Sequence, residues 1–254
     1  GNDGKATGNT FDVSGDYWYV EGIKFLNGGG VRVGGNHNIL KNCDFAGHTN
    51  SGLSISRTDG ATEQKDWPSY NQIISCNAYN NRDKSDNNAD GFAAKLTCGV
   101  GNVFKYCVAA YNADDGWDLF AKVQTGSIGV VTIKNSIAYA NGYLEDGTDA
   151  GNGNGFKMGG ENIHVAHYLK DCISWGNKRS GVDSNYNPGF KMRNVISYNN
   201  EGPNIKLYSG TGNIMKDENG SQTDANKKPY KFDYDMKGVV SCADPAKGAI
   251  NFDQ

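Results

Sequence analysis

A short unit recurs six times along this chain, and the recurrence limits the possible folds more than any other feature. Most copies contain a small or thiol-bearing residue, a run of alternating apolar residues, an asparagine and, further on, a glycine followed by an apolar residue. The first of these positions is occupied in turn by Cys43, Cys76, Cys107, Ser136, Cys172 and Val195. The intervals are 33, 31, 29, 36 and 23 residues. A period of this length that is built from short strands indicates a solenoid.

The strands of this solenoid are predicted to be parallel. No segment has the 3.6-residue apolar spacing of a helical solenoid, whereas residues 130–133 are strand-like. Hairpin turns at the regular spacing of an antiparallel fold are also missing. Variable intervals suit a right-handed parallel β-helix, because loops of different length leave its coil unchanged. We therefore expect an all-β, right-handed parallel β-helix as one domain over residues 1–254. No amphipathic capping helix precedes Asp16, so an N-terminally trimmed chain is expected.

An asparagine follows the repeat position by five residues in five of the copies. These residues are Asn81, Asn112, Asn141, Asn177 and Asn200, while the first copy has His48. Stacked at about 4.8 Å, the spacing of neighbouring strands, their amides can bond to one another and to the turns. We therefore predict an asparagine ladder. The same stacking sends four of the six cysteines into one interior column, where buried, reduced thiols are favoured over disulfides.

Alignment of the glycines Gly91, Gly116 and Gly155 orders the second strand of each unit. Side chains alternate between the two faces of a strand, so Trp117 and Phe156 are predicted to pack in the core. The next residue of each strand points outward, which sets Lys157 one coil from Asp118, on solvent. Four aspartates are predicted to converge beside this lysine, and they are Asp90, Asp114, Asp115 and Asp118.

Clustered carboxylates repel one another, so this group needs a cation. Four oxygen ligands on flexible turns suit Ca²⁺ better than Mg²⁺. Zinc is not expected, because histidines are few and the cysteines face inward. A nearby divalent cation favours a neutral amine, which makes Lys157 a candidate base. The plainer alternatives are aspartates that only stabilise turns and a lysine that is only solvated.

The segments Asn88–Leu96, Asp114–Asp118 and Asn154–Lys157, together with the ladder, resemble the family 9 polysaccharide lyases. The resemblance extends over about residues 16–215. It implies that Asp90, Asp114, Asp115 and Asp118 hold Ca²⁺ and that Lys157 is the catalytic base. The implied activity is β-elimination of an acidic plant polysaccharide, the pectin backbone, with pectate lyase favoured and rhamnogalacturonan lyase as the alternative. The cations expected to hold substrate carboxylates are Lys178, Arg179 and Arg193.

Other functions on the same fold remain as alternatives. An inverting pectin hydrolase would use aspartates such as Asp114 and Asp115, but its Gly-His-Gly and Arg-Ile-Lys segments do not occur. A non-catalytic carbohydrate-binding module would keep the cation and would not need Lys157. An epimerase would also remove a C5 proton. His164 and His167 have metal-like spacing but would face opposite ways on a strand, so we interpret them as structural.

The bulk composition excludes two classes of partner. A net charge of -3 gives no phosphate-binding surface, so no nucleic acid is expected. No run of about 18 apolar residues occurs, so no membrane span is expected. We expect a monomer that is secreted or located at the cell surface or in the periplasm.

Overall fold

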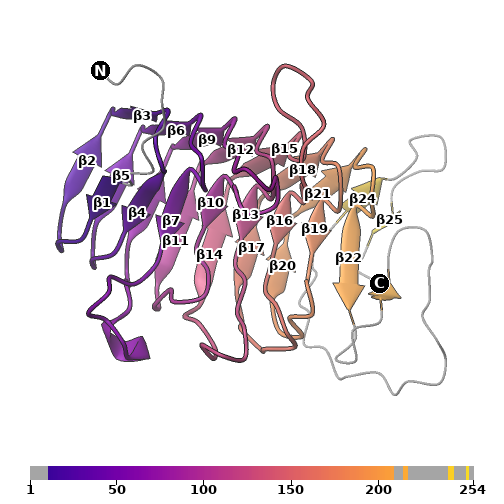
Figure 1. Ribbon diagram of the computed structural model, residues 1–254. Helices are drawn as coiled ribbons and strands as arrows, with labels where there is room; N and C mark the ends of the chain where they lie inside the picture. The colour runs from indigo at the N-terminus through magenta and orange to yellow at the C-terminus, as the bar shows by residue number, and fades with distance from the viewer. Residues whose placement is uncertain (1–10, 209–213, 217–239, 243–249, 252–254) are drawn as a thin grey trace.

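The computed structural model describes residues 11–208, 214–216, 240–242 and 250–251, and three sheets dominate it (Figure 1). The front sheet contains β1 (Phe11–Val13), β4 (Val31–Val33), β7 (Leu53–Ile55), β10 (Phe92–Ala93), β13 (Trp117–Asp118), β16 (Phe156–Lys157), β19 (Val182–Asp183), β22 (Ile205–Tyr208) and β23 (Ile214–Lys216). The back sheet contains β2 (Tyr19–Glu21), β5 (Ile39–Lys41), β8 (Gln72–Ile74), β11 (Asn102–Lys105), β14 (Val131–Lys134), β17 (Tyr168–Lys170) and β20 (Lys191–Arg193). The top sheet contains β3 (Lys24–Leu26), β6 (Asp44–Ala46), β9 (Asn77–Tyr79), β12 (Val108–Ala110), β15 (Ile137–Tyr139), β18 (Ile173–Trp175), β21 (Ile196–Tyr198), β24 (Val240–Cys242) and β25 (Ile250–Asn251).

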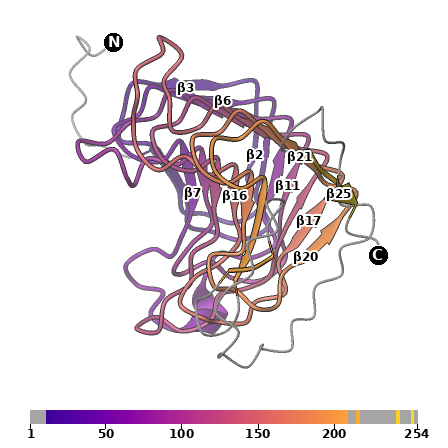
Figure 2. The same cartoon turned by 90° about the vertical axis from the view of Figure 1, so that its right-hand side faces the viewer.

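Each coil visits the front, back and top sheets in that order, and successive coils pair in parallel. Antiparallel pairing between named strands is found, within the described residues, for β23 on β22 and β25 on β24. Figure 2 looks along the solenoid and shows the front and back sheets on opposite sides, with the top sheet joining them. The expected parallel β-helix is therefore confirmed. The expectation of a single domain covers residues 1–254, and part of that range lies outside the described residues.

The register of the front sheet follows the glycine alignment. Phe92 pairs with Trp117, and Trp117 pairs with Phe156. Their rings contact one another in the interior with centroids 4.9 Å apart in both pairs, and all three side chains are buried. Trp117 and Phe156 are thus core residues, as predicted, because each coil places one large ring over the ring below it.

The predicted asparagine ladder is present at the turn between the top and front sheets. The Nδ2 group of Asn112 donates to Oδ1 of Asn141 at 2.9 Å, and Asn81 and Asn177 repeat this bond with their own neighbours. Each of these amides also donates to a carbonyl oxygen in the preceding coil, as Asn141 does to Ala109. The ladder satisfies backbone groups that the turn would otherwise bury without partners.

A second ladder, which sequence analysis did not predict, lines the turn before the back sheet. The backbone N–H of Asn38 donates to Oδ1 of Asn71, and that of Asn71 donates to Oδ1 of Asn102. Two coils further on, His167 takes the asparagine position and its Nδ1 accepts from the N–H of Val131 at 3.0 Å. His167 is completely buried and serves as a hydrogen-bond acceptor in this ladder, which agrees with its interpretation as a structural residue.

We expect His167 to make the protein sensitive to acid. Burial lowers the pKa of His167 from 6.5 to about 3. Between these pH values, His167 is therefore neutral in the folded state and protonated in the unfolded state. Its contribution to stability is therefore present above pH 6.5 and is lost as the pH falls toward 3. His167→Asn keeps a ladder acceptor without the titration. Between pH 8 and 4.5, the unfolding free energy of the variant should gain about 2.7 kcal/mol relative to wild type.

Urea unfolding at the two pH values measures this difference, and the exposed His164 supplies the control as His164→Asn. Parallel pH profiles for His167→Asn and wild type would show that the ladder histidine carries no such linkage.

The interior cysteines are inert. Cys43, Cys76, Cys107 and Cys172 are buried and free, as is Cys98, which lies outside their column. Burial raises the pKa of the Cys107 and Cys172 thiols to about 12, so both stay protonated near neutral pH. The thiol of Cys107 donates to the carbonyl oxygen of Ile73 at 3.3 Å. The predicted reduced thiols are confirmed for these positions.

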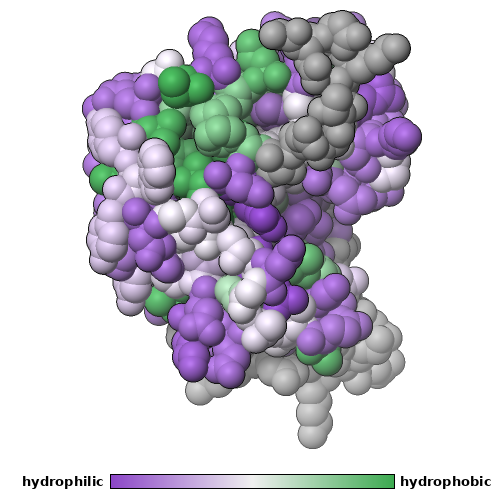
Figure 3. Space-filling view, turned by 60° about the vertical axis from the view of Figure 1, so that its left-hand side comes forward, coloured by the Kyte–Doolittle hydropathy of each residue, from purple (hydrophilic) through white to green (hydrophobic). Residues whose placement is uncertain are grey.

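The end of the solenoid formed by the first described coil carries an apolar patch. Phe11, Trp18, Tyr19 and Leu26 are each at least half exposed there, and Figure 3, which brings this end forward, shows apolar side chains gathered on it. An end coil has a neighbour on one side only, which explains this exposure. Within the described ranges, the single helix is the short 3-10 turn Gln64–Asp66, and none is long and apolar enough to cross a membrane.

Candidate active site

Three neighbouring strands of the front sheet, β10, β13 and β16, position the predicted site residues. Asp118 on β13 pairs with Lys157 on β16, as the glycine alignment predicts. Gly116 precedes β13, and a Cβ atom there would lie 2.6 Å from the carbonyl oxygen of Gly155. Only glycine allows this close approach of two coils. The turn residues Asp114 and Asp115 are therefore held at a fixed height against the neighbouring coils.

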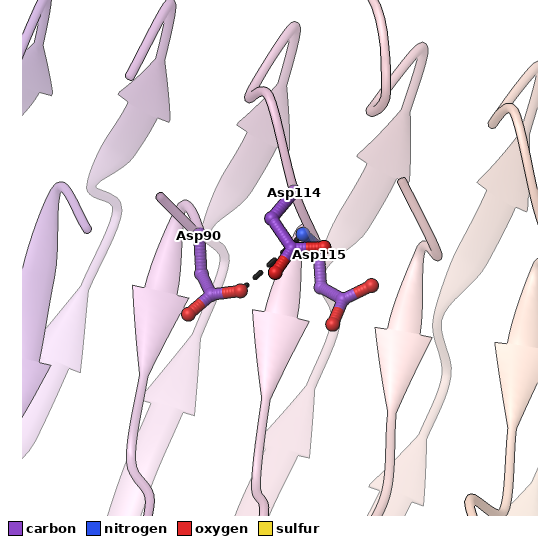
Figure 4. A group of neighbouring side chains, drawn as sticks. All are labelled: Asp90, Asp114 and Asp115. Atoms are coloured by element: carbon purple, nitrogen blue, oxygen red, sulfur yellow. Dashed lines mark hydrogen bonds between the residues drawn. The ribbon is translucent and has the colours of Figure 1, made fainter. Parts of the chain in front are cut away.

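Asp90, Asp114 and Asp115 form a tight acidic group, which we call the aspartate triad. One carboxylate oxygen of each lies within 4.8 Å of those of the other two, and all three residues are buried. Figure 4 shows Asp90 and Asp114 turned toward one another, with the backbone N–H of Asp115 donating to Oδ1 of Asp90 at 3.3 Å. Three carboxylates at this distance cannot all be ionised without a compensating charge.

Hydrogen bonds fix two members of the triad and leave the third open. Asp90 accepts from the Ser51 hydroxyl at 3.1 Å. Asp115 accepts through Oδ1 from both the backbone and the side-chain N–H of Asn154, at 2.9 and 2.7 Å. By contrast, Oδ1 of Asp114 is buried and has no hydrogen-bond partner, and Oδ2 of Asp115 has only the Lys157 amine beside it. A buried oxygen without a partner is costly, and a metal ion would satisfy it.

Asp118 lies beside the triad, between two lysines. Its Oδ2 atom is 2.8 Å from Nζ of Lys95 and 3.4 Å from Nζ of Lys157. Lys95 also contacts Oδ2 of Asp90 at 2.7 Å, and Lys157 lies 3.1 Å from Oδ2 of Asp115. Sequence analysis gave Lys95 no role, although it lies in the Asn88–Leu96 motif. Its position five residues after Asp90 was the available signal, but the loop that turns it back was not predictable.

The electrostatics of the group follow from burial and from like charges. Burial and the neighbouring carboxylates raise the pKa of Asp114 from 3.8 to about 9. Burial also raises the pKa of Asp90 to about 7, against the opposing effect of Lys95. Burial lowers the pKa of the Lys157 amine, but Asp115 and Asp118 outweigh this and raise it. The site therefore retains protons that a divalent cation would displace.

Removal of Lys95 should destabilise the protein. Lys95→Met would leave Asp118 with one lysine and Asp90 without its nearest cation, and an uncompensated buried carboxylate costs about 3 kcal/mol. Urea unfolding in the presence of a chelator measures this loss. Lys122→Met is the matched control, because Lys122 lines the same cavity and forms no ion pair within the described residues. Equal losses in the two variants would contradict the role of Lys95.

The site is less open than the sequence predicted. Lys157 was expected on solvent, but its side chain is only 21% exposed and the paired Asp118 only 3%. The residues that cover it come from the loops around β10 and β13, and the ring of Phe120 lies 5.6 Å from the Lys157 amine. Together they form an open cavity of about 270 Å³ lined by Asn87, Asn88, Lys95, Leu96, Asp114, Asp118, Phe120, Lys122 and Lys157.

The three cations predicted to hold substrate lie apart from this cavity lining. The Lys178 amine pairs with Asp149 and donates to the carbonyl oxygen of Ala150 at 2.7 Å. Arg179 is exposed on the turn before β19. Arg193 lies at the end of β20 in the back sheet, on the opposite side of the solenoid from the aspartate triad (Figure 2). The structure does not bring Arg193 together with Lys157, because strand order assigns it to another sheet.

Comparison with known proteins identifies the family. Residues 2–219 match the family described as the Pel9A-like, right-handed β-helix region. The chain belongs to this family. The resemblance to family 9 polysaccharide lyases is thereby confirmed, and the curated relatives of this Pel9A-like chain agree with it.

Pectate lyase L of Thermoclostridium stercorarium is 51% identical over 210 residues, which are 81% of this chain and 17% of that protein. Pectate lyase L of Dickeya chrysanthemi is 37% identical over 249 residues, 92% of this chain and 55% of that protein. This Pel9A-like chain thus spans about half of the length of the second relative and less than a fifth of the first.

Two solved structures share the fold. The crystal structure of pectate lyase Pel9A matches with a TM-score of 0.62 and 34% identity, over 92% of this chain and 54% of that one. A rhamnogalacturonan lyase matches with a TM-score of 0.52 and 22% identity, over 91% of this chain and 66% of that one. At that identity, the second likeness extends to the fold alone. The Pel9A-like chain is therefore a β-helix with lyase relatives and a buried acidic site.

Proposed function

We propose that this chain is the catalytic region of a calcium-dependent pectate lyase, which cleaves galacturonate polymers by β-elimination. The observation that carries the proposal is the contact of the Lys157 amine with Asp115 and Asp118, at the edge of the aspartate triad. A base and a cation site in contact are what removal of a proton beside a carboxylate requires. The pectate lyase relatives support the same activity.

The residues present suit a calcium ion. The triad offers carboxylate oxygens only, and the unpartnered Oδ1 of Asp114 is a free ligand atom. Hard oxygen donors of this kind suit Ca²⁺. We infer that Asp90, Asp114 and Asp115 hold the ion, with Asp118 at its edge. When bound, calcium would neutralise a substrate carboxylate and stabilise the charge that develops beside it.

The role of Lys157 is proton transfer. As a neutral amine it takes the C5 proton of a galacturonate residue, and the electron pair of that C–H bond forms the C4–C5 double bond. The C4–O bond then breaks and the leaving oxygen takes a proton, so no water is consumed. The aspartates raise the pKa of Lys157, so compensation of their charge is needed before the amine can act as a base.

Substrate carboxylates need cations, and three lysines line the cavity of the site. We infer that Lys122 binds a neighbouring uronate, because its amine forms no ion pair within the described part of the chain, whereas Lys95 and Lys157 are paired with aspartates. Lys178 and Arg179 remain candidates further along the front side of the solenoid. Sequence analysis missed Lys122, since it lies in a loop of the kind that varies between coils.

The hydrolase alternative fits the geometry less well. An inverting hydrolase needs two carboxyl groups about 6.5–9.5 Å apart, with room for water between them. Oxygens of Asp114 and Asp115 lie within 4.8 Å of each other and beside a lysine.

A polymeric substrate also favours action outside the cytoplasm, so we propose a secreted, cell-surface or periplasmic location.

Ultraviolet absorbance of the product tests the proposal. Elimination creates a conjugated double bond, whereas hydrolysis does not. We expect absorbance to rise on polygalacturonate and to stay flat with a chelator, and a slower rise on rhamnogalacturonan. Reducing ends that appear without absorbance would replace the lyase with a hydrolase. A rate unchanged by chelator would remove calcium from the proposal.

A further inference from the structure

An aromatic column runs along the outer face of the top sheet. Consecutive register positions hold Tyr79, Ala110, Tyr139, Trp175 and Tyr198. The rings of Tyr139 and Trp175 stack with centroids 4.6 Å apart and planes 5° apart, and Tyr198 continues the stack at 6.0 Å. Ala110 breaks this column, because it carries no ring.

The break leaves a slot for one ring. Tyr79 and Tyr139 are two coils apart, about 9.6 Å at the spacing of neighbouring strands, so a flat ring between them would lie one stacking distance from each. Within the described residues, Tyr79 stacks on no aromatic ring. A cavity of about 180 Å³ opens here, lined by Asn77, Ala78, Tyr79, Val108, Ala110, Tyr111, Tyr139 and Glu145.

A tyrosine at the turn beside the slot supplies one of its walls. Tyr111 has φ of 56°, in the left-handed region, as do Asn80, Ala140 and Gly176 at the equivalent turn positions of other coils. Its ring meets Tyr139 edge to face at 5.3 Å and forms a side wall of the cavity.

The polar groups at the rim are acidic. Asn80 accepts from the backbone N–H of Glu145 at 2.9 Å and donates to its Oε2 at 2.8 Å, which holds this carboxylate at the slot. A neighbouring cavity shares Glu145 and adds Asp146. Neither lining contains a lysine or an arginine. By contrast, three lysines line the cavity at Lys157. The lining of that cavity shares no residue with the lining of the slot.

We propose that this slot binds a neutral sugar ring of a polysaccharide. Aromatic faces bind the apolar C–H face of a sugar, and a carboxylate accepts hydrogen bonds from its hydroxyl groups. A uronate would be repelled by Glu145 and would find no cation among the residues that line the slot. The proposal rests on the proposed function in taking a polysaccharide as the partner. The slot would then hold the polymer through its neutral residues while the lysine-lined cavity takes the uronates.

Binding of β-1,4-galactotetraose to the full chain tests this, followed by saturation-transfer NMR and by Trp175 fluorescence. Wild type should bind it in preference to tetragalacturonate at the slot. Tyr79→Ala should weaken binding roughly threefold to tenfold, the value of one aromatic contact. Tyr198→Ala is the matched control, since it stacks on Trp175 outside the slot and should bind as wild type does.

Ala110→Leu fills the slot without removing a wall and guards against misfolding of the tyrosine variant; it should abolish binding. Glu145→Gln should let tetragalacturonate bind. Absence of binding, or equal binding by Ala110→Leu and wild type, would overturn the proposal. Absorbance on unbranched polygalacturonate, measured with the same samples, should be unchanged in Tyr79→Ala. If the wild-type protein gives no rise in absorbance, the proposed lyase activity is rejected. The binding measurements then still test the slot on their own.

Discussion

Replacement of Lys157 by alanine should lower the rate of product formation on polygalacturonate by roughly 10²- to 10⁴-fold, the usual contribution of a general base. The effect should fall on kcat, because the amine contacts Asp115 and Asp118 and is placed to take the proton rather than to hold the chain. The rise in ultraviolet absorbance measures it. Lys157→Arg should also be inactive, since a guanidinium does not deprotonate near neutral pH.

Two controls separate catalysis from structure. Calcium titration by calorimetry should still show binding to Lys157→Ala, because the aspartate triad is intact and a competing positive charge has been removed. Lys170→Ala removes an amine that pairs with Asp171 at the end of β17 in the back sheet, and it should keep activity within a small factor. Activity of Lys157→Ala near that of wild type would show that a group other than Lys157 removes the proton.

The periodic part of the molecule was predictable because each coil repeats the same physical requirement. One glycine allows the close approach of two coils, the next residue fills the core, and the one after it faces outward. This placed Trp117 in the core and Lys157 beside Asp118, one coil apart. The asparagine ladder followed in the same way, because stacked turns need the same amide at each level.

The loops were not predictable, and they determine how the site is closed. Lys95 leaves β10 and returns to Asp90 and Asp118 within five residues, a path that no period specifies. Lys122 and Phe120 come from the loop after β13. These segments turn an expected surface cluster into a partly covered cavity. The second ladder was hidden for a related reason: its asparagines precede strands whose spacing varies, and Val131 interrupts it.

Calcium should raise the melting temperature of the wild-type protein by roughly 5–10 °C when it is present at about 100 times its dissociation constant, since binding to the folded state then contributes about 2.7 kcal/mol. Magnesium should contribute less, because it demands a stricter geometry. Asp114→Asn should lose this gain, as it removes a ligand with an unpartnered oxygen. In chelator the same variant should melt above wild type, because the raised pKa of Asp114 marks a carboxyl group that is costly to bury.

The opposite signs are the strength of this experiment. A merely structural aspartate would lower the melting temperature in both conditions when changed to asparagine, whereas a ligand raises it without metal and lowers it with metal. Asp59→Asn, at an exposed aspartate far along the chain from the triad, should respond to calcium as wild type does. Differential scanning calorimetry with calcium, with magnesium and with chelator provides the comparison. An equal calcium gain in Asp114→Asn and wild type would exclude the aspartate triad as the calcium site, because a buried triad oxygen without a hydrogen-bond partner would then play no part in binding.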